Sequence, residues 1–222
     1  MNNIEGFILA VGASRRMGRD KAKLRLEDKT FIDLAANALH KITGGKISVV
    51  GNLPFENLRV KLPSNKTYEL LVIADVQDKN SPAALVGLHA ALIRAERNWA
   101  AVVACDLPFV TADLFERLVA FDAEEDFDAV VPVQPEGRVQ PLCALYKCAA
   151  CLPLIEEMLR GDDWSLRNFL ERINTRFIEF ERLRDLPDSD FFFLNVNTPE
   201  DYLAAQKFTA FKRSNRRKSE MG

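Results

Sequence analysis

The chain has no long apolar run and no secretion signal. None of its apolar stretches approaches the roughly 20 residues that a membrane-spanning helix needs, and its start lacks a basic segment followed by an apolar one. The formal net charge at pH 7 is only −2, which gives no reason to expect nucleic-acid binding. We therefore expect a cytoplasmic protein whose partners include neither a nucleic acid nor a membrane.

The sequence is also poor in residues that build metal centres or nucleophilic sites. It has four cysteines and two histidines. Cys148 and Cys151 have the spacing of a zinc-ligand pair, but no second Cys/His pair stands at a suitable distance, and structural zinc needs four ligands. We interpret the thiols as buried side chains in a reducing compartment. No Ser/His/Asp or Cys/His arrangement indicates covalent catalysis.

What the sequence does have is an alternation of short apolar runs and helical segments, which predicts a parallel sheet covered on both faces. Its 222 residues suit one large α/β domain. We predict a three-layer α/β/α Rossmann-like fold with a mostly parallel central sheet. The expected strands are 6–10, 46–50, 69–73, 99–104, 128–132, 141–146, 175–180 and 191–195, and the expected helices are 30–41, 83–97, 112–121, 149–160, 165–172 and 199–207.

Capping residues mark three of the expected helix starts. Ser81-Pro82 and Thr198-Pro199 each place a hydroxyl before a proline at the first helical position, and Thr111 precedes the helix expected at 112–121. The domain is expected to span residues 1–207. Residues 208–222 are basic and polar without periodicity, so we predict a disordered tail, with attraction of an anionic substrate as the alternative.

The most informative segment follows the first apolar run, at 6–10. Small residues come next, and then Arg15, Arg16, Arg19 and Lys21. Small residues let the backbone approach a bulky anion, while backbone N–H groups and basic side chains supply the donors and charge that phosphates need. The segment has neither the ending of a Walker A loop nor a Gly-x-Gly-x-x-Gly fingerprint. It predicts a nucleotide-phosphate site of a third type.

Carboxylates follow two other expected strands. Asp106 ends the most apolar strand and is followed by Leu107-Pro108, and Asp75 ends another. Ligands of α/β sheets bind at the carboxyl ends of strands, and Mg²⁺ binds carboxylates together with substrate phosphates. We interpret Asp106 as a Mg²⁺ ligand, with a simple turn-capping role as the alternative. Asp75 could accept hydrogen bonds from a guanine or from a ribose hydroxyl.

Residues 9–24 resemble the signature L-A-G-G-x-S-x-R-M-G-x-D-K-A-x-L of the molybdenum cofactor guanylyltransferase (MobA) family of the nucleotidyltransferase superfamily. Val11 stands where that family has a glycine. Three further stretches are similar to family motifs: 106–108 to Asp-x-Pro, 138–146 to Q-P-L-x-A-L-Y, and 193–201 to F-x-N-x-N-T-P-E-D. The stretch 80–88 matches the family only loosely. The resemblance implies a nucleotidyltransferase fold.

The resemblance also implies Mg²⁺-dependent transfer of GMP from GTP to the phosphate of a molybdopterin-type cofactor, with release of pyrophosphate. Proteins that deliver or receive the cofactor are further possible partners. The implied GTP-binding residues are Leu9, Ala10, Val11, Gly12, Lys21, Asp75 and Asp106. The implied catalytic residues are Arg15, Arg16, Lys21 and Asp106; the acceptor site would use Arg138, Gln140, Asn195 and Asn197, and the metal would use Asp106 and Asn197.

Two alternatives to this function stay open at the level of sequence. One is a sister transferase that uses CTP or another phosphorylated acceptor, because Val11 and the stretch 80–88 both lie near the expected base site. The other is a homologue that binds nucleotide or a partner without turnover, for which Val11 is the only support. For Val11 itself, we expect the main chain rather than the side chain to contact the nucleotide.

Overall fold

The computed structural model describes residues 3–11, 24–51, 57–61, 67–73, 83–122, 126–161 and 163–220. The strands are β1 Ile4–Leu9, β2 Arg25–Leu26, β3 Lys29–Thr30, β4 Ile47–Val50, β5 Asn57–Lys61, β6 Thr67–Ile73, β7 Trp99–Ala104, β8 Ala129–Pro132, β9 Cys143–Lys147 and β10 Thr175–Ile178. The helices are α1 Phe31–Thr43, α2 Ala83–Arg94, α3 Ala112–Asp122, α4 Cys148–Arg160, α5 Leu166–Glu171 and α6 Pro199–Glu220, with short 3-10 turns η2 Phe180–Arg182 and η3 Ser189–Phe191.

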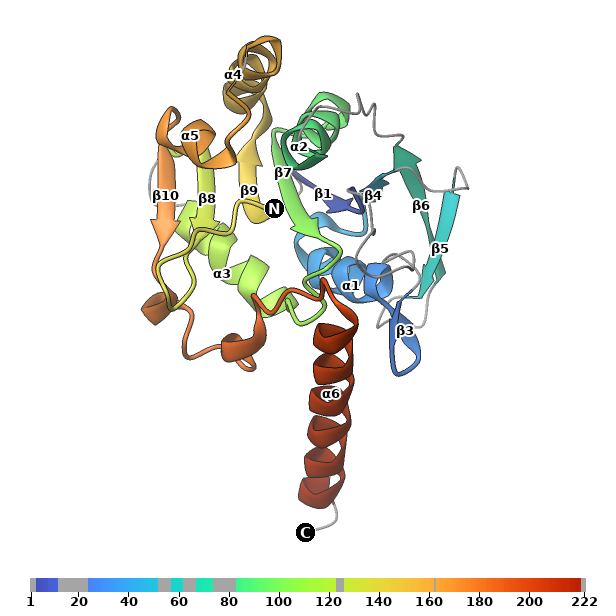
Figure 1. Ribbon diagram of the computed structural model, residues 1–222. Helices are drawn as coiled ribbons and strands as arrows, with labels where there is room; N and C mark the ends of the chain where they lie inside the picture. The colour runs from blue at the N-terminus through green and yellow to red at the C-terminus, as the bar shows by residue number, and fades with distance from the viewer. Residues whose placement is uncertain are drawn as a thin grey trace.

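Eight of the strands form one sheet in the order β10-β8-β9-β7-β1-β4-β6-β5. The strands β9 and β5 run against the other six, so the sheet is mostly parallel, as predicted. Helices α1 and α3 cover one face, and α2, α4 and α5 cover the other (Figure 1). The three-layer α/β/α prediction is confirmed.

The two core layers explain why the central strands are apolar throughout. In β1, Ile8 packs into the layer beneath α1 and α3, whereas Phe7 and Leu9 pack into the layer beneath α2 and α4. In β7, Val103 packs into the same layer as Ile8, and Val102 packs into the same layer as Phe7. Successive side chains of a strand point to opposite faces, so a strand covered on both faces needs apolar residues at every position.

Seven of the eight expected strands form, and the run 191–195 does not. Its first residues lie instead in η3 and the turn that follows, where Phe192 is buried and Phe191 stacks against Phe208 with ring centroids 3.7 Å apart. Two elements were not expected from the sequence, the hairpin β2–β3 and the edge strand β5. In the hairpin, Glu27 adopts φ +55°, a conformation that turns usually assign to Gly or Asn.

Helix α6 continues to Glu220, beyond residue 207, where we expected the last helix to end (Figure 1). Aromatic contacts hold its middle turns: Phe208 stacks on Phe191 and meets Phe109 edge-on, with ring centroids 5.2 Å apart. Lys212 forms an ion pair with Asp188. Periodicity alone did not reveal these contacts, because their partners lie in other segments of the chain. No helix in the described part of the chain is long and apolar enough to cross a membrane.

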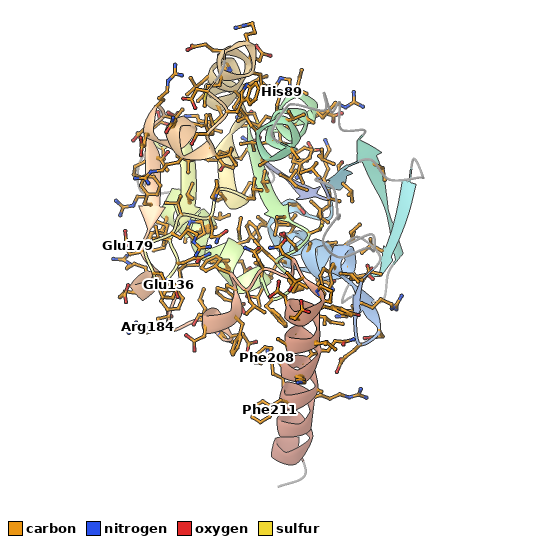
Figure 2. The ribbon with its side chains drawn as sticks, in the orientation of Figure 1. His89, Glu136, Glu179, Arg184, Phe208 and Phe211 are labelled. Carbon is orange, nitrogen blue, oxygen red and sulfur yellow. The ribbon has the colours of Figure 1, made fainter. Side chains whose placement is uncertain are left out.

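The stacking of Phe208 predicts its contribution to stability. Figure 2 shows Phe208 on α6 nearer the body of the molecule than Phe211, whose side chain is 63% exposed. We expect Phe208→Ala to lower the free energy of unfolding by about 1–3 kcal/mol, because it removes a partly buried ring and its stacking. The matched control Phe211→Ala should change it by less than about 0.5 kcal/mol. Urea denaturation of both variants measures the difference, and equal losses would show that the aromatic contacts do not anchor α6.

Candidate active site

The first strand ends between two neighbours that fix its exit from the sheet. The Leu9 carbonyl accepts a hydrogen bond of 3.0 Å from the Cys105 N–H, and the Ala10 N–H donates one of 2.8 Å to the Val50 carbonyl. The chain therefore leaves the sheet at its carboxyl edge, between β7 and β4. This edge is where α/β sheets bind their ligands.

A hydrogen bond joins two segments that are far apart in the sequence. The Val196 N–H donates to the Asp106 carbonyl over 2.9 Å. Val196 is buried, whereas Asp106 and both neighbouring asparagines, Asn195 and Asn197, are partly accessible. The structure therefore brings the expected metal ligands, Asp106 and Asn197, to one place at the end of β7.

The backbone of Asn197 is held from its other side by the start of α6. The Asp201 carboxylate accepts hydrogen bonds from the N–H groups of Asn197 and Thr198, each 2.9 Å long, and the Thr198 hydroxyl accepts one of 3.1 Å from the Asp201 N–H. This reciprocal arrangement is a capping box. It confirms the capping role expected for Thr198.

Thr111, which we expected to cap α3, makes no capping hydrogen bond. The Thr111 hydroxyl is buried and has no hydrogen-bond partner among the described residues, so the expectation that it caps α3 is wrong. A proline-containing turn, Leu107-Pro108, precedes it, and backbone hydrogen bonds such as Val110 N–H to the Leu107 carbonyl, 3.4 Å, organise this segment instead. The third cap, Ser81-Pro82, lies outside the described residues.

The two expected acceptor residues of the β8–β9 connection lie in different surroundings. Gln140 is buried, and its N–H donates a hydrogen bond of 3.0 Å to the Pro132 carbonyl. Two residues later, the Leu142 carbonyl accepts a hydrogen bond from the N–H of Ala104, the last residue of β7. Arg138 is exposed near the tip of the turn, next to Gly137, which adopts φ +77°. Glu136, which Figure 2 labels, lies at that tip. The structure therefore places Gln140 close to the end of β7 and Arg138 farther out.

Several of the expected site residues lie outside the described residues. The described part of the chain stops at Val11 and resumes at Leu24, and it stops again at Ile73, the end of β6. The expectations that fall in these intervals concern Gly12, Arg15, Arg16, Lys21 and Asp75.

Val11 occupies space that a glycine of α2 leaves open. A Cβ atom built on Gly87 would lie 3.0 Å from both Cγ1 and Cγ2 of Val11, closer than ordinary contact. Val11 is partly buried and packs against the layer that α2 covers. Its side chain is therefore directed at α2, and a small residue at position 87 is the condition for this packing.

A second glycine, Gly51, stands beside the same exit. A Cβ atom built on it would lie 2.7 Å from the Ala10 carbonyl oxygen, which is too close for any side chain. Neither Gly51 nor Gly87 was expected from the sequence to shape this exit. The signal that could have revealed Gly51 is its place directly after a buried strand, where a glycine often marks close backbone approach.

The cysteines form no metal centre in the described part of the chain, where no group of three or more His, Cys, Asp or Glu side chains could hold a metal ion. All four thiols, which fall within the described residues, are buried, and none forms a disulfide. Burial raises the pKa of the Cys148 thiol to about 11 and raises the pKa of Cys143 and Cys151 further. These thiols stay protonated near neutral pH, which makes them poor nucleophiles and poor metal ligands.

The contact between Val11 and Gly87 predicts that Gly87→Ala has opposite effects on stability with and without the Val11 side chain. With Val11 in place, Gly87→Ala should destabilise the protein by up to about 2 kcal/mol, because crowding of about 1–3 kcal/mol outweighs a gain in helix propensity of about 1 kcal/mol. In a Val11→Gly background the same substitution should stabilise by about 1 kcal/mol, because only the helix propensity remains. A double-mutant cycle by urea denaturation measures the coupling. Additive effects would mean that the two residues do not constrain each other.

Comparisons with known proteins agree with this geometry. Residues 6–176 match the family model described as MobA-like NTP transferase domain. A relative from Pelotomaculum thermopropionicum, named "Probable molybdenum cofactor guanylyltransferase", is 33% identical over 211 residues, which cover 95% of this chain and 96% of the relative. The "Molybdenum cofactor guanylyltransferase" of Desulfosudis oleivorans is 30% identical over 207 residues, 93% of this chain and 96% of that protein.

A solved structure shows the same fold. The molybdopterin-guanine dinucleotide biosynthesis protein A of Archaeoglobus fulgidus superimposes with a TM-score of 0.71 at 24% identity, covering 93% of this chain and 98% of that one. The family model and the relatives both span most of the chain. The chain therefore belongs to the MobA-like nucleotidyltransferase family.

Proposed function

We propose that this chain transfers GMP from GTP to the phosphate of a molybdopterin-type cofactor, giving a guanine dinucleotide and pyrophosphate. The observation that carries the proposal is the hydrogen bond from Val196 to Asp106, which brings two sequence motifs of the family together at the carboxyl edge of the sheet. The names of the two relatives support the same activity.

The attacking group in this reaction is a phosphate oxygen that is already an anion, so the enzyme needs no general base. Nucleotidyl transfer asks the protein mainly to position two charged substrates and to stabilise the charge that develops on the leaving pyrophosphate. The protonated, buried thiols and the absence of a catalytic triad in the sequence are compatible with this requirement.

The residues at the end of β7 fit a divalent metal, and we assign it as Mg²⁺. Asp106 offers a carboxylate and Asn197 an amide oxygen, both of the hard type that Mg²⁺ prefers, and backbone hydrogen bonds fix the chain at both positions. When bound, the metal would neutralise charge on the phosphates as a Lewis acid. Asp106 and Asn197 would hold it, and Asn195 would contact the acceptor beside them.

The remaining roles belong to the loop after β1 and to the neighbouring strand ends. Lys21, with Arg15 or Arg16, would hold the triphosphate and stabilise pyrophosphate. Leu9, Ala10, Val11 and Gly12 would contact GTP through their main chain, which the packing of the Val11 side chain against Gly87 supports. Asp75 would accept hydrogen bonds from the base or the ribose, and Arg138 and Gln140 would contact the pterin.

Loss of the Asp106 charge tests the metal site. We expect Asp106→Asn to reduce turnover by at least about 100-fold, because an anionic ligand to the metal is replaced by a neutral one. The fold should survive, since the hydrogen bond to Val196 uses the backbone carbonyl of residue 106. The control is Asp113→Asn, an exposed carboxylate in the first turn of α3. Near-normal Mg²⁺-dependent release of pyrophosphate by Asp106→Asn would refute the assignment.

A comparison of Lys21 with Arg19 tests whether the loop after β1 holds the GTP phosphates through a specific contact. Lys21→Ala should raise KM for GTP and lower kcat together, because a charge that holds the phosphates acts in both the ground state and the transition state. Arg19→Ala, two residues away, removes the same charge and should have a much smaller effect. Steady-state kinetics at fixed ionic strength provide both constants. Equal effects at the two positions would indicate general electrostatic attraction instead of a specific contact.

A further inference from the structure

Helix α6 exposes apolar side chains along one side. Leu203 and Phe211 are 56% and 63% exposed, the highest fractions among the large hydrophobic side chains of the described residues. At about 3.6 residues per turn, they lie about 80° apart around the helix axis, and exposed Lys207 lies midway between them. Exposed Ala204 and Ala210 flank them and widen the apolar surface to more than about 100°. We call these five residues the outer stripe of α6.

The other side of α6 is already packed against the body of the molecule. Ala205 is buried, and the Tyr202 hydroxyl donates a hydrogen bond of 2.6 Å to the Arg25 carbonyl. Lys212 forms its ion pair with Asp188 on this side as well. A surface helix with one packed face normally carries polar residues on the opposite face. The outer stripe departs from this pattern, and a contiguous exposed apolar surface is typical of an interaction site.

The outer stripe is nearly symmetric about Lys207. Ala204 and Ala210 lie three residues before and after it, and Leu203 and Phe211 lie four residues before and after it. A second α6 that runs antiparallel and crosses at Lys207 therefore sets a large apolar residue opposite a large one, and alanine opposite alanine. A two-fold dimer requires this kind of self-complementary surface. The pattern thus identifies a second copy of the chain as the partner that fits the stripe.

The charges of α6 favour the same antiparallel arrangement. Glu200, in its first turn, is exposed, whereas residues 212–220 carry five basic side chains and one acidic one. Two of the basic ones, Lys212 and Arg213, face acids of the body, which still leaves an excess of positive charge at this end. An antiparallel pair brings the acidic start of each helix beside the basic end of the other, and a parallel pair would bring like charges together.

We propose that the outer stripe is the interface of a two-fold dimer of this chain, in which the two α6 helices pair antiparallel. Leu203 of each copy packs against Phe211 of the other, and the two Lys207 side chains lie near the two-fold axis with their ammonium groups in solvent. Figure 1 shows α6 extending away from the body, so the two bodies lie at opposite ends of the helix pair. About three turns of helix make a small interface, so the dimer is weak and reversible.

Sedimentation velocity over a range of protein concentrations tests the proposal without substrate. The wild-type chain should shift from monomer to dimer as its concentration rises, and Phe211→Ala should weaken association at least about tenfold. Lys207→Gln should strengthen it by about two- to fivefold, because two like charges near the axis are removed. The matched control is Phe177→Ala, which removes another exposed ring, on β10, and should leave association unchanged. In dilute, monomeric protein Phe211→Ala should barely change the free energy of unfolding, which separates an interface role from a folding role.

Disulfide cross-linking tests the orientation of the two helices. All four native thiols are buried, so cysteines introduced at positions 204 and 210 are the reactive ones. An equal mixture of Ala204→Cys and Ala210→Cys should form linked dimers on mild oxidation, whereas each variant alone should form few, because a disulfide needs Cα atoms within about 7 Å.

Three results would overturn the proposal: a monomer at every concentration, which would leave the outer stripe to a different partner; unchanged association in Phe211→Ala; or cross-links within each single variant instead of the mixture, which would indicate a parallel pair. The inference does not rest on the function proposed above. Failure of that function would appear separately, as no pyrophosphate release from GTP and acceptor.

Discussion

The hydrogen bond from the Val196 N–H to the Asp106 carbonyl holds the candidate active site together. It joins the end of the central strand β7 to the segment that leads into α6, although 90 residues separate the two positions in the sequence. The donor residue is buried and the capping box of α6 fixes the next residue, so the joint is constrained from both sides. The hydrogen bond itself uses a backbone donor and a backbone acceptor, so it does not depend on the side chains of Asp106 and Val196.

The second constraint is space at the exit of β1. Gly51 leaves room for the Ala10 carbonyl, and Gly87 leaves room for the side chain of Val11. A family position that usually carries glycine can therefore hold valine here, because a glycine of the neighbouring helix supplies the missing volume. Since close-packed interiors tolerate little additional volume, the loop after β1 starts from a fixed position. Small residues at this site therefore serve packing.

The sequence predicted the layers of the fold well because buried strands and amphipathic helices leave strong local signals. The family motifs implied that Asp106 and Asn197 share one site, and the hydrogen bond from Val196 to Asp106 brings the two segments together, although no strand forms at 191–195. The sequence did not predict the β2–β3 hairpin, whose turn uses Glu27 where glycine is usual, or β5, whose alternating charges suit an edge strand. The middle turns of α6 are held by contacts of Phe208 with distant aromatic residues, which no local pattern reveals.

The central claim is that this site transfers the nucleotidyl group of GTP to a phosphorylated pterin. Labelling at the α-phosphate tests it most directly: the protein is incubated with Mg²⁺, the molybdopterin-type acceptor and α-labelled GTP, and with γ-labelled GTP in parallel. Our account predicts that the α-label enters the acceptor, that the γ-label leaves in pyrophosphate, and that the two amounts are equal. Transfer of label from CTP in preference to GTP, or no label in the acceptor while GTP remains bound, would contradict it.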